Sequence, residues 1–211
     1  AGIESLPNEA FVGGSGHQIS DGNVPEPVQH IRADHTALFR KDKLVGWLSG
    51  EASCGMQWLT GRIREGFVSF DNPDSPGDKI GVMIVGSKVE LEPEFQNGEV
   101  FMKIKIEAES FVEEVQGQIN LDKVSTISRL EEAQNEKIRE EVRACLQKTQ
   151  QEYHIDVFGF GEAVHRRYPQ EWQSIESEWS EIYPYVQVNI QVISKIRHTS
   201  HTDKPLQSGN K

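Results

Sequence analysis

The sequence predicts an α+β fold in which an antiparallel β-sheet has a long helix and shorter helices packed on one face. Two stretches of alternating apolar and polar residues predict long strands, one around Asn97-Gly98 and one at Tyr185–Arg197. Between them, Ser128–Glu152 has apolar residues at the spacing of an amphipathic helix. The chain order of strands, then helices, then a closing strand is typical of this class.

The composition predicts a soluble, globular protein of one large domain, or one domain plus part of another. The 211 residues are 36% hydrophobic and 26% charged. The net charge of −11 makes DNA or an anionic membrane surface a poor partner for the chain as a whole, and we expect no nucleic-acid partner. No apolar run approaches the roughly 18–20 residues of a membrane span. The chain begins at Ala1 without a signal peptide, and we expect a fragment of a longer protein.

Residues 1–33 are rich in turn-forming residues, including Gly13-Gly14-Ser15-Gly16, and have few apolar side chains. We interpret them as a linker or as the end of a preceding domain. Residues 34–198 form the predicted domain, and residues 199–211 a flexible tail.

The domain is predicted to start with a hairpin whose strands are Thr36–Arg40 and Leu44–Leu48. A short helix, Gly50–Leu59, follows, with apolar residues at helical spacing. A third strand is predicted over Arg62–Phe70, and the turn-forming run Asn72–Gly77 ends it.

The pair Asn97-Gly98 predicts a second hairpin with a two-residue type I′ turn. If Gln96 pairs with Glu99, apolar pairs fall on one side and opposite charges on the other. The apolar pairs are Phe95–Val100, Leu91–Ile104 and Val89–Ile106, and the charged pairs are Glu92–Lys103, Glu90–Lys105 and Lys88–Glu107. A slip of one residue would destroy both patterns. The hairpin therefore belongs to a sheet that is covered on one side.

A capping box, Ser128-Arg129-Leu130-Glu131, predicts the start of the long helix, which runs to about Glu152. Its apolar stripe consists of Ile138, Val142, Cys145, Leu146, Thr149 and Tyr153. Glu136–Arg139 and Glu140–Arg143 are predicted ion pairs on its exposed side. This helix is expected to cover the sheet.

Pro169 fits the first turn of a further helix, Pro169–Ile182, which Pro184 ends. Trp172 and Trp179 are seven residues apart and lie on one face, where we expect them to anchor the core. The strand Tyr185–Arg197 closes the domain.

No motif predicts catalysis, and we expect neither a catalytic residue, a cofactor site nor a metal site. Glu113-Glu114 is interpreted as a solvated strand end. The pair His198 and His201 lacks a third ligand at suitable spacing. His154 and His165 are interpreted as residues at helix ends, with a pH-sensing role as the weaker alternative.

The two cysteines, Cys54 and Cys145, both lie in predicted helices among apolar residues. A disulfide between them is possible, but a buried free thiol is the more common state in such positions.

Two segments together resemble a known family. The first is Asp156-Val157-Phe158-Gly159-Phe160-Gly161-Glu162, followed by Arg166-Arg167 and Tyr168-Pro169-Gln170-Glu171-Trp172, and the second is Leu38–Leu48. They resemble the Ger(x)C family, the lipoprotein subunits of nutrient receptors in bacterial endospores. The resemblance implies a curved sheet that grips a long helix.

The resemblance also implies a function. It predicts a non-enzymatic lipoprotein subunit of a germinant receptor, which assembles with integral-membrane subunits of the same receptor to trigger germination. Its place would be the outer surface of the spore inner membrane, where a lipid anchor holds the full-length protein. The alternative is an extracytoplasmic module that binds a small germinant itself, which requires a concave pocket with convergent polar groups.

The segment Phe158-Gly159-Phe160-Gly161 has two interpretations. The glycines allow a bend or a close helix contact while the phenylalanines fill the core, or the same break presents a docking surface for a membrane subunit. Asp156 is suited to cap a helix. On the second interpretation the partner-binding residues are Asp156, Phe158, Gly159, Phe160 and Gly161.

The predicted hairpin register can be tested by charge reversal. Glu92→Lys is expected to lower the melting temperature, because it places two like charges opposite each other, and Lys103→Glu in the same chain is expected to restore part of the loss. Each cross-strand pair contributes roughly 0.2–1 kcal/mol. Thermal unfolding of the two single variants and the double variant measures this coupling. Absence of any recovery in the double variant would show that the register is wrong.

Overall fold

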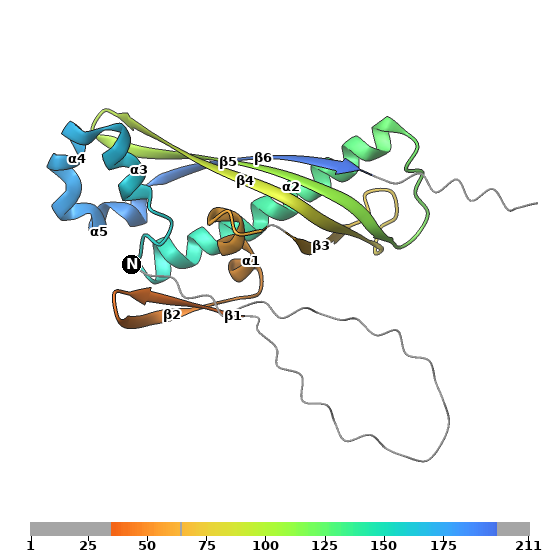
Figure 1. The fold of residues 1–211 in the computed structure, drawn as a ribbon, viewed down its shortest axis with the longest axis horizontal. Helices are drawn as coiled ribbons and strands as arrows, with labels where there is room; N and C mark the ends of the chain where they lie inside the picture. The colour runs from red at the N-terminus through yellow and green to blue at the C-terminus, as the bar shows by residue number, and fades with distance from the viewer. Residues whose placement is uncertain (1–34, 64, 198–211) are drawn as a thin grey trace, which may run out of the picture.

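The computed structural model describes residues 35–63 and 65–197 and confirms the α+β class (Figure 1). Its main sheet has the strand order β3-β4-β5-β6. The strands are β3 (Gly66–Asp71), β4 (Lys79–Gln96), β5 (Glu99–Val115) and β6 (Gln187–Arg197). The predictions for residues 1–33, for residues 199–211 and for the pair His198 and His201 lie outside the described residues.

The sheet departs from the predicted antiparallel arrangement at its last strand. The β3–β4 and β4–β5 pairs are antiparallel, whereas β6 runs parallel to β5, with Phe101 opposite Gln187. The long helix carries the chain back along the sheet, so β6 enters at the end where β5 begins. A helical crossover of this kind produces a parallel pair, and alternation of residues within a strand does not encode its direction.

The β4–β5 hairpin has the predicted register. All six predicted pairs are partners, and Asn97 and Gly98 have φ angles of 53° and 86° as a type I′ turn requires. Lys103 reaches Glu92 across the strands at 3.2 Å. The other two lysines instead pair along their own strand, Lys88 with Glu90 and Lys105 with Glu107, each at 2.5 Å.

The third strand begins at Gly66 rather than at Arg62 and ends at Asp71. Its ladder with β4 starts where Gly66 lies opposite Ile84. The preceding residue Ile63 is buried, and its carbonyl accepts a hydrogen bond from Ser87 Oγ at 2.6 Å. Its apolar side chain therefore belongs to the core although its backbone is outside the sheet.

The long helix α2 (Val124–Leu146) lies along one face of the sheet and continues as the π-helical turn Gln147–Glu152, so its predicted end is confirmed (Figure 1). Its predicted start is wrong, because Ser128 lies inside the helix. The Asn120 side chain accepts a hydrogen bond from the Asp122 backbone at 3.0 Å, and the carbonyl of Lys123 then accepts the first helical bonds. This turn begins the helix before the capping-box sequence is reached.

The buried face of α2 contacts the sheet, and four of its apolar side chains are fully buried: Leu130, Ile138, Val142 and Cys145. Within this apolar layer, Ser110 Oγ donates to Gln134 Oε1 at 2.9 Å. A hydrogen bond inside the core fixes the position of the helix on the sheet, because any sliding would leave both groups buried without a partner.

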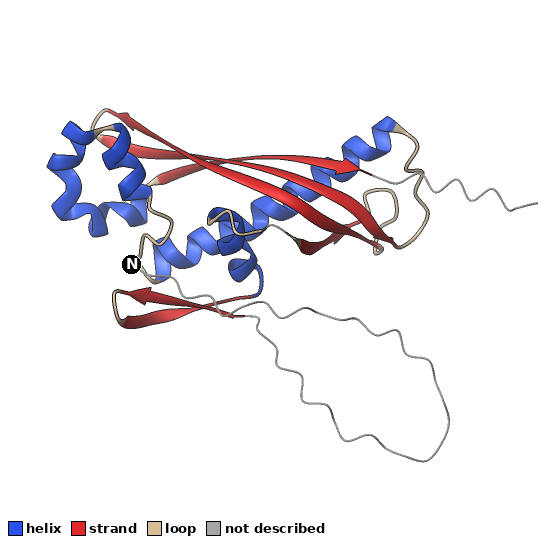
Figure 2. Cartoon of the chain, viewed as in Figure 1, coloured by secondary structure: helices blue, strands red, loops and turns tan. Residues whose placement is uncertain are grey.

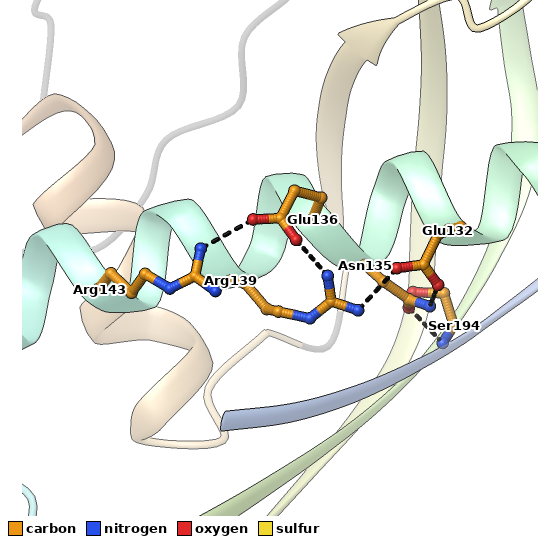
Figure 3. Close-up of polar contacts among 6 residues, drawn as sticks. All are labelled: Glu132, Asn135, Glu136, Arg139, Arg143 and Ser194. Carbon is orange, nitrogen blue, oxygen red and sulfur yellow. Dashed lines mark hydrogen bonds and ion pairs between the residues drawn. The ribbon is translucent and has the colours of Figure 1, made fainter. Parts of the chain in front are cut away.

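The exposed side of α2 carries a chain of polar contacts that reaches the sheet edge (Figure 3). Arg143 pairs with Glu136 at 2.7 Å and not with Glu140, so the predicted Glu140–Arg143 pair is wrong. Arg139 bonds to Glu136 and, at 2.8 Å, to Glu132. In the last of these contacts, Asn135 Oδ1 accepts a hydrogen bond from the backbone N–H of Ser194 at 2.8 Å. This bond satisfies a donor on the outer edge of β6 that no strand pairs with.

A separate two-stranded sheet, β1 (His35–Arg40) and β2 (Lys43–Ser49), leads into α1 (Gly50–Leu59), which packs on α2. Figure 2 shows this layer on the side of α2 away from the main sheet. A Cβ on Gly55 would lie 2.0 Å from the carbonyl oxygen of Glu141, so the two helices can approach this closely only at a glycine. Beside this contact, Trp58 Nε1 donates to Glu141 Oε2 at 2.8 Å.

The remaining helices form a compact group at one end of the sheet, which we call the helical cap (residues 160–185; Figure 1). It contains α3 (Phe160–Arg167), α4 (Pro169–Ile175), α5 (Trp179–Ile182) and the 3₁₀ turns Glu176–Glu178 and Tyr183–Tyr185. The predicted continuous helix Pro169–Ile182 is therefore wrong. A straight helix separates residues seven apart by about 10 Å along its axis, whereas the rings of Trp172 and Trp179 lie 5.3 Å apart. The 3₁₀ turn bends the chain and brings them together.

Both cysteines are free thiols, and no disulfide joins them. Cys145 is buried in the apolar layer, and burial raises the pKa of its thiol. Cys54 is exposed on α1, so the expectation of burial holds for one of the two residues only. No helix in the described part of the chain is both long enough and apolar enough to cross a membrane.

Candidate functional site

The segment from Asp156 to Gly161 contains the end of the loop that follows the π-helical turn and the first two residues of α3, and one carboxylate organises it. Asp156 Oδ1 accepts the backbone N–H groups of Gly159 and Phe160, each at 3.0 Å. Asp156 Oδ2 accepts the N–H of Gly161 at 2.8 Å and the indole N–H of Trp179 at 3.0 Å. Asp156 thus caps the first N–H groups of α3, but it does so from outside the helix, because the N-cap residue itself is Gly159. The same carboxylate also joins the start of α3 to α5.

Glycine is required at positions 159 and 161 for two different physical reasons. Gly159 has a φ of 78°, the left-handed conformation that residues with a Cβ rarely adopt. A Cβ on Gly161 would lie 2.7 Å from Trp179 Nε1 and 2.8 Å from the ring of Trp172. Glycine therefore lets α3 lie directly against both indole rings, which is the structural interpretation of the segment.

A row of aromatic rings runs through the cap. Successive ring centroids are 5.7 Å apart for Phe158–Phe160, 5.8 Å for Phe160–Tyr183, 6.3 Å for Tyr183–Trp179, 5.3 Å for Trp179–Trp172 and 5.8 Å for Trp172–His165. Such offset and edge-to-face contacts add to the stability that burial alone provides. Of the five residues predicted to bind a partner, Phe160 and Gly161 are buried in this row, and the other three are partly exposed.

The π-helical turn at the end of α2 holds the far side of the cap. Gln150 Nε2 donates to the carbonyls of Tyr183 and Val186 at 3.0 and 2.9 Å, and Gln151 Nε2 donates to the carbonyl of Pro184 at 2.8 Å. Tyr183 Oη donates to Thr149 Oγ1 at 3.1 Å. Sequence reasoning missed these glutamines, because in a helical pattern they resemble ordinary exposed residues, and nothing in the pattern marks a π-helical turn.

The same turn also holds the β1–β2 hairpin. Arg40 donates to the carbonyl of His154 at 3.0 Å, and Tyr153 Oη donates to the carbonyl of Trp47 at 3.1 Å. A Cβ on Gly46 would lie 2.3 Å from the Tyr153 ring, so the ring packs directly on the backbone of β2. His154 and His165 lie at helix ends, as expected: His154 follows the π-helical turn and contacts the Gln151 carbonyl, and His165 lies in the last turn of α3 and stacks on Trp172.

Two surface grooves flank the tip of the β4–β5 hairpin where it meets the cap. The first, of about 610 Å³, we call the basic groove; it lies between β4 and α3 and is lined by Leu91, Glu92, Pro93, Glu94, Ala163, Arg166, Arg167 and Tyr168. Arg166 and Arg167 are exposed, and neither makes an ion pair with any residue that the structure describes.

The second groove, of about 580 Å³, we call the acidic groove. It lies between the hairpin turn and α5, and its lining consists of Gly98, Glu99, Val100, Ile175, Glu178, Glu181, Ile182, Tyr185, Val186 and Gln187. Its floor is apolar and its charged groups are all carboxylates. Across residues 35–63 and 65–197, no group of three or more His, Cys, Asp and Glu side chains is placed to hold a metal ion.

Comparison with known proteins identifies the class to which the chain belongs. The class is that of the spore germination proteins. The family model described as "Spore germination B3/ GerAC like, C-terminal" matches residues 34–200, and the chain belongs to this family. The resemblance to Ger(x)C proteins is thereby confirmed.

Individual relatives agree with this assignment. The chain is 24% identical over 206 residues to "Spore germination protein KC" of Bacillus subtilis (strain 168), a match that covers 96% of the chain and 50% of that protein. It is 26% identical to "Spore germination protein B3" of the same organism, over 74% of the chain and 41% of that protein. The chain thus spans about half, or less, of the curated relatives that it matches.

A solved structure has the same fold. The "Crystal Structure of the GerBC protein" superposes with a TM-score of 0.70 at 23% identity, over 78% of this chain and 51% of that one.

The role of Asp156 can be measured by unfolding in urea. Asp156→Ala leaves four N–H groups without their acceptor and is expected to lower the free energy of unfolding by about 2–4 kcal/mol. Asp156→Asn keeps one acceptor oxygen and is expected to lose less. The matched control is Gln173→Ala, which removes an exposed side chain of the same cap and is expected to change the stability by less than about 0.5 kcal/mol. Equal stabilities for Asp156→Ala and Gln173→Ala would contradict the proposed organising role.

Proposed function

We propose that this chain is part of a non-enzymatic lipoprotein subunit of a spore nutrient receptor, which assembles with integral-membrane subunits to trigger germination. The observation that carries the proposal is the family match over residues 34–200, which includes every residue that the structure describes. In this proposal residues 34–198 are a C-terminal domain of the full-length protein, which is consistent with relatives of about twice the length.

The proposed location is the outer surface of the spore inner membrane, with the full-length protein held there by a lipid anchor. The described helices do not include a candidate membrane span, so contact with the membrane subunits would be made by surfaces of the domain. We propose that residues 156–161 serve this contact by fixing the shape of the cap. Asp156, Phe158 and Gly159 are partly exposed at its base, while Phe160 and Gly161 support it from within.

Co-purification from spores tests this assembly. A tagged full-length protein, extracted in mild detergent from the spore membrane, is expected to retain integral-membrane subunits of one receptor, identified by mass spectrometry. Spores that lack the protein are expected to lose the response to at least one nutrient. Tagged protein without any enriched membrane protein, together with normal nutrient responses in its absence, would contradict the proposal.

A second candidate function is direct binding of a small nutrient, and the basic groove favours it. Arg166 and Arg167 lie without ion-pair partners at one wall, and Glu92 and Glu94 lie at the other. This arrangement offers a carboxylate site and an ammonium site within one groove, which suits an amino acid. Against it, Glu92 already pairs with Lys103, and the groove is an open feature of the surface.

Thermal unfolding with nutrients at millimolar concentration separates the two functions. A nutrient at a hundred times its dissociation constant stabilises the native state by about 2.7 kcal/mol. If the basic groove binds the nutrient, the double variant Arg166→Ala, Arg167→Ala loses the shift in melting temperature. The control double variant Lys43→Ala, Lys195→Ala makes an equal change of charge elsewhere and is expected to keep the shift. A panel without any shift removes the support for direct binding and favours the assembly function.

A further inference from the structure

Tyr185 is the most exposed aromatic residue among those described, with 82% of its surface accessible. Tyrosine is enriched in protein interfaces, because its ring supplies apolar contact area and its hydroxyl can form a hydrogen bond. Its two neighbours in the same 3₁₀ turn, Tyr183 and Pro184, are both buried. The turn therefore points one aromatic side chain outwards while the rest of it is packed into the protein.

The backbone around Tyr185 is held from beneath. Gln150 donates to the carbonyls of Tyr183 and Val186, and Gln151 donates to the carbonyl of Pro184, so hydrogen bonds fix the chain on both sides of the exposed residue. Ordering entropy is a main cost of association, and a side chain on a fixed backbone loses less of it on binding. Tyr185 is thus a preorganised anchor.

The acidic groove surrounds this anchor with apolar groups. Ile175 and Ile182 are partly exposed in it, and Val100 and Val186 are buried in its floor. An apolar floor of this kind is suited to a partner's aliphatic or aromatic side chain, which would be removed from water against Tyr185.

The charges at the rim specify the partner further. Glu99, Glu178 and Glu181 are exposed, and their carboxylates make no hydrogen bond or ion pair with any described residue. The groove's lining contains no lysine, arginine or histidine. A rim of carboxylates of one sign is complementary to a cationic segment.

We propose that the acidic groove is the docking site for a protein segment that carries an apolar anchor side chain flanked by Lys or Arg, and that an integral-membrane subunit of the receptor supplies this segment. The identity of the supplier rests on the proposed function. The groove chemistry disfavours an anionic lipid surface as the occupant, because three carboxylates would face negatively charged headgroups.

Photo-crosslinking in spores tests the groove directly. The full-length protein carrying Tyr185→p-benzoylphenylalanine is expected to form an adduct with an integral-membrane subunit upon irradiation, identified by mass spectrometry. Adding Glu178→Lys and Glu181→Lys reverses the rim charge and is expected to lower the adduct yield about tenfold or more. The same crosslinker at Val124, which is 81% exposed at the start of α2 and outside the groove, is expected to give no such adduct.

Matched controls separate charge from folding. Glu113→Lys with Glu140→Lys makes an equal change of charge at exposed glutamates outside the groove and is expected to leave the adduct yield unchanged. Equal melting temperatures of the two charge-reversal pairs, measured on the purified chain, show that the rim substitutions do not act through unfolding.

The outcomes distinguish this inference from the function on which it rests. Co-purification of membrane subunits without an adduct at Tyr185, or an adduct with lipid alone, overturns the proposal that the acidic groove is the docking site. Either result leaves the assembly function intact. An adduct yield that both charge-reversal pairs lower equally also overturns it. Failure of the unsubstituted protein to retain any membrane subunit refutes the assembly function itself.

Discussion

The π-helical turn that ends α2 is the contact on which the arrangement of the whole domain depends. A regular α-helix presents successive side chains about 100° apart, so Gln150 and Gln151 would ordinarily face different directions. In this turn both side-chain amides reach carbonyls of one stretch of chain, at Tyr183, Pro184 and Val186. The next residues, Tyr153 and His154, bind the β1–β2 hairpin. One short segment therefore fixes both the first and the last parts of the described domain against its central helix.

Close backbone approaches extend this constraint through the molecule. Gly46 lies under the Tyr153 ring, Gly55 lies against the backbone of α2, and Gly161 lies against Trp172 and Trp179. At each position a Cβ would lie within 3 Å of its neighbour, so the layers can assume these distances only with glycine. Within the segment Phe158-Gly159-Phe160-Gly161, Gly161 thus has the same role as Gly46 and Gly55, whereas Gly159 is favoured by its positive φ. The distinctive sequence of the segment follows from the packing of the cap.

The sequence was sufficient to predict the parts of the fold that depend on local pattern. The β4–β5 register follows from one Asn-Gly turn and the alternation on either side of it, and α1 follows from apolar spacing alone. Three features depend on distant contacts and could not be predicted in this way. The direction of β6 depends on the path of the crossover, the break in the Pro169–Ile182 helix depends on the Trp172–Trp179 contact, and the start of α2 depends on a turn at Asn120. In the candidate site, the capping role of Asp156 was readable from its position, whereas Gln150 and Gln151 carried no signal before the π-helical turn was known.

The charged groups of the cap can select a partner because hydrogen bonds hold the cap in a fixed position. The protein is acidic overall, yet the cap presents unpaired arginines in one groove and unpaired glutamates in another, on either side of the same hairpin tip. On a mobile segment such groups would average their positions, and their fields would be weak and unspecific. Here Asp156 holds one end of the cap and the π-helical turn holds the other, so hydrogen bonds position the cap, which supplies one wall of each groove and sets the spacing between them. A partner that engages both grooves must therefore match this spacing as well as the charges. Under the proposed function, such a requirement would favour a single orientation of the domain on its partner, and a defined orientation would allow a change in one subunit to reach another.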